Sequence, residues 1–286
     1  MLVLLFRLQS SKSTVEFDAL FIFMETRRMG HPLLELKDKT AVVIGGTSGI
    51  GLAIAKGLAV AGANVVATGR REDLVLQVTG EIEQLGRRSL AVSCDVMDVS
   101  ALENLLAKVR AELGPVHILV NSAGRTKRTP TLQVSDEEWR SIIDTNLTGT
   151  MRSCRIFGRH MVEQKYGRII NIGSLASFVG LYEVAAYTAS KAGVAGLTRS
   201  LALEWAKFNV CVNMIAPGVF RTELNAALLD GTERGREFLL RTPMKRFGHL
   251  DELVGAAVFL ASDAASFVTG QSIAVDGGFL ASGVNQ

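Results

Sequence analysis

From Lys39 onward, short runs rich in β-branched residues alternate with longer segments whose apolar residues follow the helical period. This alternation is typical of βαβ units on a parallel sheet. It predicts an α/β protein with a doubly wound Rossmann fold, in which one seven-stranded parallel sheet carries helices on both faces. The expected strands are Thr40–Ile44, Asn64–Thr68, Ser89–Cys94, Ile118–Asn121, Arg168–Ile172, Val210–Ile215 and Ser272–Val275.

The first 35 residues do not follow this pattern. Their apolar stretches, Met1–Phe6 and Ala19–Met24, are far shorter than the roughly 20 residues that cross a bilayer. A secretory signal would place positive charge before its apolar stretch, and a transit peptide would be poor in acidic residues; neither holds here. We therefore expect residues 1–35 to be an extension, either disordered or upstream of the natural start, and residues 36–286 to form one domain.

Composition narrows the class of partner. The chain has 31 basic and 28 acidic residues, a net charge of +3, and no block of like charge, so nothing favours nucleic acid or a membrane surface. A small molecule is the expected partner. The three cysteines are far apart and suit reduced core thiols of a cytoplasmic protein. The four histidines show no ligand spacing, so no metal site is expected.

The first strand runs directly into a glycine-rich turn, Gly45-Gly46-Thr47-Ser48-Gly49-Ile50-Gly51, which opens a helix. Glycines let the backbone approach a pyrophosphate, whose charge is favoured by the free N–H groups at a helix start. The spacing departs from the dinucleotide fingerprint G-x-G-x-x-G. By itself the turn therefore fits either a nucleotide site or an ordinary strand-to-helix connection.

The second strand ends in Gly69-Arg70-Arg71, where an NAD site would place an acidic residue against the ribose 2′-hydroxyl. Without that carboxylate a 2′-phosphate meets no repulsion, and a guanidinium can bind it in bidentate fashion. The segment favours NADP, with NAD possible. The alternative is that both arginines only begin a solvated helix.

Tyr187 and Lys191 are four residues apart at the start of a long helical segment, so they share one helix face. An ammonium there is expected to lower the pKa of the phenol from about 10 towards neutrality. General acid–base catalysis works best when the pKa of the group lies near the operating pH.

With this pair, the segment from Leu36 to Gln286 resembles the short-chain dehydrogenase/reductase family. The family's Thr-Gly-x-x-x-Gly-x-Gly turn matches Gly45, Gly49 and Gly51, with Ile44 in place of threonine. Its Asn-Asn-Ala-Gly segment matches Asn121-Ser122-Ala123-Gly124, with one departure. Ser174 stands thirteen residues before Tyr187, as the family's serine does.

The resemblance implies a set of site residues. The catalytic residues would be Asn146, Ser174, Tyr187 and Lys191. The cofactor would be bound by Gly45, Thr47, Ser48, Gly49, Ile50, Gly51, Arg70, Arg71, Asp95, Val96, Asn121, Ala123, Gly124, Tyr187, Lys191, Pro217, Gly218, Val219 and Thr222. Asn121 and the C-terminal Asp276-Gly277-Gly278 can equally be structural.

The resemblance also implies a reaction and an assembly. Ser174 would polarise a carbonyl, Tyr187 would exchange the proton, Lys191 would hold the nicotinamide ribose and Asn146 a relay water. The expected substrate is thus a carbonyl compound or secondary alcohol. A homotetramer or homodimer is expected, because a monomer would leave the apolar helices Trp139–Met161 and Ala185–Trp205 incompletely covered.

The substrate itself remains open between two groups. Residues from Arg241 onward resemble gluconate 5-dehydrogenases and related sugar-acid or polyol dehydrogenases, and Arg125, Thr126, Lys127, Arg128 and Arg221 suit a basic mouth for a carboxylate, or else a solvated loop. The alternative is a 3-oxoacyl-[acyl-carrier-protein] reductase. That group usually has a basic residue where Phe208 stands, although Lys165 offers a second contact. A non-catalytic NADP-binding regulator is a further alternative.

Overall fold

The computed structural model describes residues 31–222 and 225–283, so residues 1–30 of the expected extension lie outside it. Within the described residues, one parallel sheet of six strands has the order β2-β1-β3-β4-β5-β6. Its strands are β1 Thr40–Ile44, β2 Asn64–Thr68, β3 Ile118–Asn121, β4 Gly167–Ile172, β5 Val210–Pro217 and β6 Ser272–Val275.

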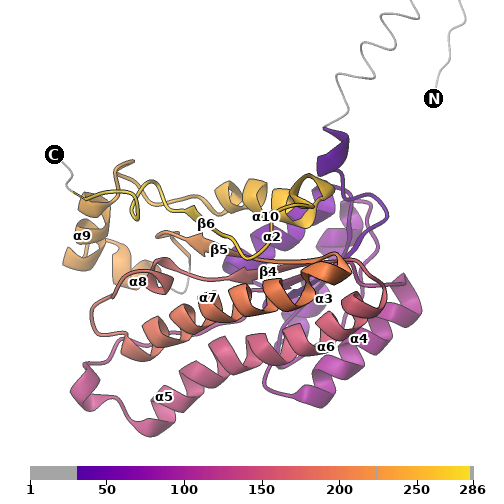
Figure 1. Cartoon of the computed structure of the whole chain (residues 1–286). Coiled ribbons are helices and arrows are strands. Elements are labelled where there is room, and N and C mark those ends of the chain that lie inside the picture. Colours follow the sequence, from indigo (N-terminus) through magenta and orange to yellow (C-terminus); the bar gives the residue numbers. More distant parts are fainter. Residues whose placement is uncertain (1–30, 223–224, 284–286) are drawn as a thin grey trace, which may run out of the picture.

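Helices cover both faces of this sheet (Figure 1). Apolar residues of β1 alternate between two cores, with Ala41 and Val43 on one face and Val42 and Ile44 on the other. The first core is completed by α2 Gly49–Val60, α3 Glu72–Gln84 and α10 Val254–Ala261. The second is completed by α4 Val99–Leu113, α6 Gly149–Glu163 and α7 Ala185–Trp205.

One expected strand, Ser89–Cys94, is not a strand, which corrects the count from seven to six. The segment lies along the outer edge of β2, and the N–H of Cys94 donates to the carbonyl of Gly69 at 2.9 Å. In the middle of the segment, however, the contact with β2 is made by a side chain: the hydroxyl of Thr68 donates to the carbonyl of Val92 at 2.6 Å. Side-chain bonds in place of a backbone ladder leave the segment extended but outside the sheet.

The order of the strands positions the functional site. The chain passes from β1 to β2 on one side and then crosses back to β3 on the other side of β1, which makes the carboxyl edge of β1 the point where the winding reverses. Ligands of open α/β sheets bind outside the carboxyl ends of the strands at such a point. The glycine turn follows β1 and therefore lies at this edge.

The helix on the second face is continuous from α5, Asp136–Ile143, through a π-helical segment, Asp144–Thr148, into α6. Ser135 caps its start by accepting the N–H of Glu138 at 3.2 Å, and three acidic residues follow in the first turn. The wide turn contains Asn146. Such π-helical insertions occur frequently at functional sites.

The long stretch between β5 and α10 contains, among its described residues, two short helices, α8 Ala226–Leu229 and α9 Glu233–Arg241. The other described helical turns are of the 3₁₀ type, at Pro32–Leu34, Thr131–Gln133, Leu175–Ser177, Ala206–Phe208, Leu250–Leu253 and Asp263–Ala265. No helix among the described residues is long and apolar enough to cross a membrane. The three cysteines, Cys94, Cys154 and Cys211, are unpaired and buried.

Candidate active site

The glycine turn packs tightly against the loop that follows β3. A Cβ atom at Gly45 would lie 2.5 Å from the backbone nitrogen of Ala123, and one at Gly51 only 2.0 Å from the carbonyl oxygen of Gly45. Gly45 and Gly49 also have positive φ angles, 77° and 53°. Glycine is therefore required here by close contact as well as by conformation.

The start of α2 is available to a ligand. Its N-cap residue, the exposed Ser48, makes no side-chain capping hydrogen bond, so the first-turn amides around Gly49 and Ile50 lack that partner. Thr47 beside them is buried. A pyrophosphate suits this cradle, because backbone N–H groups and the helix dipole both favour an anion there.

The end of β2 faces this same turn. A Cβ at Gly69 would lie 2.9 Å from the hydroxyl oxygen of Thr47, and Nη2 of Arg71 donates to Oγ of Ser48 at 3.5 Å. Arg70 and Arg71 are both exposed. The structure therefore places the guanidinium of Arg71 beside the glycine turn, with Arg70 exposed next to it in the chain and no carboxylate at the strand end.

Asp95 and Val96, which are expected to bind the cofactor, lie on the loop before α4. Oδ1 of Asp95 accepts the N–H of Met97 at 2.9 Å, which holds the turn before α4. Val96 is buried and packs against Gly149, where an added Cβ would meet it at 2.9 Å. Val96 thus fixes the loop to α6, and Asp95 remains partly exposed.

Asn121 lies in a buried hydrogen-bond network. Its Nδ2 donates to Oδ1 of Asn171 at 2.9 Å, and its Oδ1 accepts from the hydroxyl of Ser153. Asn171 in turn donates to the hydroxyl of Thr198 at 3.0 Å. The side chain of Asn121 therefore connects β3 to β4 and α6. This is a structural role, which the sequence analysis gave as the alternative to cofactor binding.

Ser174, Tyr187 and Lys191 come together at the carboxyl edge of β4. Ser174 follows β4, and its hydroxyl accepts the N–H of Ala176 at 3.2 Å, which leaves its own proton available for donation to another oxygen. That hydroxyl also hydrogen-bonds the phenol of Tyr187. Lys191 is buried, with Nζ donating to the carbonyl of Ile172 at 2.7 Å.

The electrostatics of this pair differ from the expectation. Burial raises the pKa of Tyr187, and the hydrogen bond from Ser174 offsets this in part. Burial lowers the pKa of Lys191 to about 8. Nζ of Lys191 lies 5.7 Å from the centroid of the Tyr187 ring and bonds a carbonyl instead of the phenol. The pKa of the phenol is therefore raised and not lowered as expected, because burial is the largest influence on it.

The fully buried Asn146 joins this group through its side chain. Its Nδ2 donates to the carbonyl of Arg125 at 2.9 Å and to the hydroxyl of Ser190 at 3.0 Å, while Oδ1 accepts the N–H of Arg125 at 2.8 Å. Ser190 donates onward to the carbonyl of Tyr187 at 2.7 Å. The amide thus holds the loop after β3 against α7.

The segment after β5 approaches the glycine turn. The methyl of Thr222 lies 3.7 Å from where a Cβ of Gly49 would stand, and the N–H of Gly218 donates to the carbonyl of Val275 at 2.8 Å. Pro217 ends β5, and the carbonyl of Val219 accepts the N–H of Gly248 at 3.0 Å. The residues expected at the nicotinamide end are therefore anchored beside the turn expected at the pyrophosphate.

Known proteins share this architecture. A family model described as enoyl-(acyl carrier protein) reductase matches residues 45–280. A 2-dehydro-3-deoxy-D-gluconate 5-dehydrogenase of Escherichia coli strain K12 is 41% identical over 250 residues, covering 86% of this chain and 97% of the relative. The chain belongs to the short-chain dehydrogenase/reductase family.

Two further members of the family are informative. A 3-oxoacyl-[acyl-carrier-protein] reductase of the same strain is 39% identical over 245 residues, covering 86% of this chain and 98% of the relative. The crystal structure of a gluconate 5-dehydrogenase from Burkholderia cenocepacia J2315 in complex with NADP and tartrate has a TM-score of 0.85 and 35% identity, covering 88% of this chain and 98% of that one. This short-chain dehydrogenase/reductase is thus an NAD(P)-dependent oxidoreductase acting on CH–OH groups.

Most cations expected to form the basic mouth of this short-chain dehydrogenase are already paired. Arg221 forms a bidentate ion pair with Asp230, with Nη2 and Oδ2 2.6 Å apart. Lys127 pairs with Glu138 at 2.6 Å. Arg128 pairs with Glu183, and Arg125 donates to the hydroxyl of Ser141. These cations are therefore exposed to solvent, and each of them has a partner within the chain.

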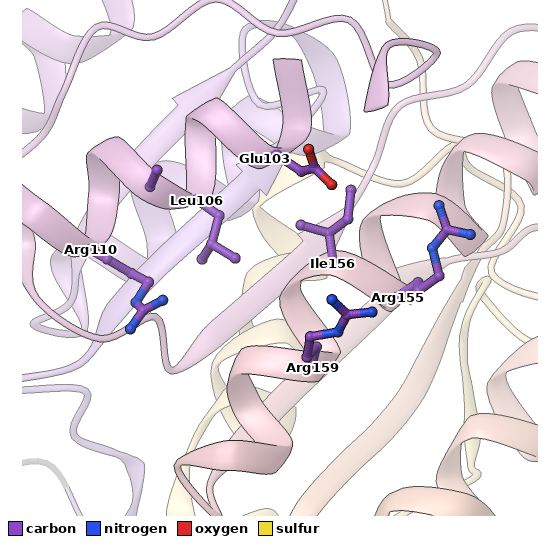
Figure 2. A pocket seen from close by; sticks show the side chains of 7 residues that line it. Glu103, Leu106, Arg110, Arg155, Ile156 and Arg159 are labelled. Atoms are coloured by element: carbon purple, nitrogen blue, oxygen red, sulfur yellow. The ribbon is translucent and has the colours of Figure 1, made fainter. Parts of the chain in front are cut away.

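A groove elsewhere on the molecule also carries arginines. It lies between α4 and α6, with a volume of about 360 Å³, and the side chains of Arg110, Arg155 and Arg159 surround Leu106 and Ile156 (Figure 2). None of the expected site residues lines it. The groove is separate from the candidate active site.

Two residues that the sequence analysis did not single out support the site, Ser177 by direct contact and Arg234 through the loop before Tyr187. Ser177 accepts the N–H of Ser174 at 3.3 Å and donates to the carbonyl of Lys191 at 2.9 Å. Arg234 on α9 donates to the carbonyl of Tyr182, five residues before Tyr187, at 3.3 Å. Neither residue belongs to a recognisable sequence motif. Their roles depend on tertiary contacts, which the sequence pattern does not reveal.

Proposed function

We propose that this short-chain dehydrogenase transfers hydride between NADP and a secondary alcohol or ketone of a sugar acid, such as gluconate and 5-ketogluconate. The observation that carries this proposal is the convergence of the Ser174 hydroxyl, the Tyr187 phenol and the buried Lys191 ammonium at the sheet edge that also holds the glycine turn. Such a group can polarise a carbonyl and exchange a proton with its oxygen.

The residues divide the reaction between them. In reduction, the hydroxyls of Ser174 and Tyr187 donate to the substrate carbonyl oxygen, and Tyr187 releases its proton to that oxygen. In oxidation, Tyr187 is the base. Lys191 stabilises negative charge that develops on the phenol and holds the cofactor ribose, and Asn146 positions the water that exchanges the proton with solvent. Bound NADPH supplies the hydride, and NADP⁺ accepts it.

Two features support NADP as the preferred cofactor, with NAD as a weaker one. The end of β2 carries Arg70 and Arg71 where an acidic reader of the 2′-hydroxyl would stand, and Nη2 of Arg71 reaches Ser48 of the phosphate cradle. The Burkholderia relative was crystallised with NADP. Asp95 and Val96 at the adenine end, and Pro217, Gly218, Val219 and Thr222 at the nicotinamide end, would complete the site.

A sugar acid is supported over an acyl thioester on a carrier protein. The E. coli relative with 41% identity is a sugar-acid dehydrogenase. Phe208 packs against the second core of the sheet, so its own side chain presents no cation where carrier-protein reductases usually have a basic residue; the ammonium of the adjacent Lys207 lies 5.1 Å from the centroid of its ring. The carrier-protein reductase remains the second candidate, because a relative of that name is 39% identical.

The assembly and location follow from the surface and the thiols. A homotetramer or homodimer is supported by large apolar side chains left exposed on the long helices, Trp139 at 41% and Leu203 at 84%. Cytoplasmic location is supported by the three unpaired cysteines, which suit a reducing compartment.

A substrate panel tests the function. Gluconate, other sugar acids, neutral polyols and an acetoacetyl thioester are each supplied with NADP and with NAD, in the direction that each allows, and turnover is read from cofactor absorbance. The largest kcat/KM is expected for a sugar acid with NADP. A larger value for the acetoacetyl thioester would assign the protein to the carrier-protein reductases, and no turnover of any substrate would favour a regulator.

A further inference from the structure

Two arginines meet at the loop that leads into α7. Arg234, the second residue of α9, donates from Nη1 to the carbonyl of Tyr182 at 3.3 Å. Arg128, from the loop after β3, lies on the ring of the same tyrosine, with Cζ 5.7 Å from the ring centroid. Segments from three parts of the chain therefore bring two guanidinium groups to Tyr182.

The two cations differ in their acidic partners. The carboxylate of Glu183 pairs with Arg128, with Nε and Oε2 2.7 Å apart. Glu237, on the same helix as Arg234, pairs with Arg241 at 3.9 Å. Glu183 and Glu237 act on Arg234 only through their charge, so Arg234 has no direct ion pair within the described residues.

The surroundings of Arg234 favour an anion. The side chain is partly buried, and its Cζ lies 5.4 Å from the centroid of the Phe238 ring. Burial is the main cause that lowers the pKa of Arg234, and the guanidinium of Arg128 lowers it further, while the carboxylates of Glu237 and Glu183 act in the opposite direction. A bound carboxylate would likewise oppose the cost of burying this charge.

The loop beneath the cluster is held in a strained conformation. Glu183 has a φ of 60°, a left-handed backbone that non-glycine residues seldom adopt. Its carbonyl accepts the N–H of Thr129 at 2.8 Å, and its carboxylate holds Arg128. Such strain persists where surrounding contacts impose it, and is concentrated at ligand sites. Four residues later the chain reaches Tyr187.

We propose that Arg234 binds the carboxylate of the sugar acid and thereby selects anionic substrates over neutral polyols. The inference rests on the proposed function and names the residue that sets its substrate class. A guanidinium binds a carboxylate through two parallel N–H bonds, whereas the hydroxymethyl group of a polyol offers no charge. Arg128 is already engaged with Glu183 and supports the site by orienting the loop.

The test compares gluconate with sorbitol, in which a hydroxymethyl group replaces the carboxylate. Arg234→Met should lower kcat/KM for gluconate by roughly 10- to 100-fold, mainly through KM, and leave kcat/KM for sorbitol unchanged. Arg234→Lys should recover part of the loss. Arg236→Met, an exposed arginine on the same helix, is the matched control and should change neither value.

The outcomes separate the inference from the function it rests on. Suppose that the parent enzyme oxidises gluconate, and that Arg234→Met leaves the ratio of kcat/KM for gluconate to kcat/KM for sorbitol unchanged, whether or not both values fall. The inference is then overturned and the proposed function stands. If the parent oxidises no sugar acid, the proposed function fails first, in an assay that needs no variant. Calorimetric titration of gluconate into the NADP⁺-loaded variants should show the same loss of affinity for Arg234→Met alone.

Discussion

At the scale of single residues, the proton chemistry depends on one phenol. Tyr187→Phe should reduce turnover by at least about 100-fold, because positioned proton transfer contributes roughly 10²–10⁴-fold. Cofactor affinity, measured by fluorescence titration, should stay the same. Tyr182→Phe, an exposed tyrosine, is the control for loss of a hydroxyl. Residual turnover above about a tenth would remove Tyr187 from the acid–base role.

The cofactor preference is also set by individual residues. Arg70→Ala should weaken NADP by about 10- to 100-fold and leave NAD kinetics nearly unchanged, since a charge-assisted contact is worth roughly 1.5–3 kcal/mol. Arg71→Ala should have a smaller effect, because Arg71 also contacts Ser48 at 3.5 Å. kcat/KM for both cofactors decides the matter, with Arg236→Ala as control. A parent that favours NAD, or an unchanged ratio in Arg70→Ala, would contradict the assignment.

The obvious converse substitution is a poor test. Gly69→Asp would supply the acidic reader of a 2′-hydroxyl, but its Cβ would meet the hydroxyl of Thr47 at 2.9 Å. A loss of activity would then report a displaced turn as well as a repelled phosphate. Substitution of the arginines avoids this ambiguity.

Motif spacing identified the residues that gather at the site. It did not predict the direction in which the pKa of Tyr187 shifts, because that shift depends on burial. The four-residue interval between Tyr187 and Lys191 shows that both lie on one face of a helix, but not that both are withdrawn from water. Burial opposes either charge, raising the pKa of the tyrosine and lowering that of the lysine to about 8. An interval in sequence carries no information on desolvation.

At the scale of elements, one hydroxyl joins β4 to α7. Ser177 bonds the N–H of Ser174 and the carbonyl of Lys191, so it sets the distance between the segments that carry the serine and the lysine. Ser177→Ala should lower kcat on the order of 10-fold with KM nearly unchanged, because small misplacements of reacting groups are costly. Ser177→Thr, which keeps the hydroxyl, should restore much of kcat. A lower melting temperature with unchanged kcat would instead indicate a purely structural role.

Two histidines fasten the amino ends of the strands. Nδ1 of His117 accepts the N–H of Thr40 at 3.0 Å, and Nε2 of His160 accepts the N–H of Val116 at 3.1 Å. Both must be neutral to accept. Burial is the main cause that lowers their pKa, to about 4 for His117.

The sign of the resulting pH dependence is fixed. Below pH 6.5 the unfolded chain binds protons that folded His117 refuses until about pH 4, so stability falls as pH falls through this window. The loss from His117 should be roughly 1–3 kcal/mol. Urea unfolding at several pH values measures it, and His117→Asn should flatten the dependence. An equally steep fall in that variant would contradict the assignment.

The elements show what a hydrophobic pattern can and cannot predict. Five expected strands agree closely with β1 to β5, and Ser272–Val275 agrees with β6. The exception, Ser89–Cys94, has a pattern typical of a strand but lies outside the sheet. It contacts β2 partly through side-chain hydroxyls such as that of Thr68, and a hydrophobic pattern does not predict such bonds. Likewise, Arg234 reaches Tyr182 only because the chain folds back over 52 residues.

At the scale of the whole molecule, the exposed helix faces predict self-association. Light scattering at micromolar concentration should give two or four times the 30.7 kDa of one chain. The exposed Leu203 on α7 is a suitable position to weaken that association, through Leu203→Glu, without touching the core. A monomer as the sole species in the parent protein would contradict the prediction.

The buried cysteines have a practical consequence. Burial raises the pKa of Cys94 and Cys154 to about 12 and also raises that of Cys211, so thiolate is scarce at neutral pH on every thiol of the chain. Maleimide reagents should leave the native protein unlabelled. A cysteine introduced at an exposed position, for example Phe267→Cys, would then be the one reactive thiol, and a fluorophore or spin label could be attached there without first removing the natural cysteines.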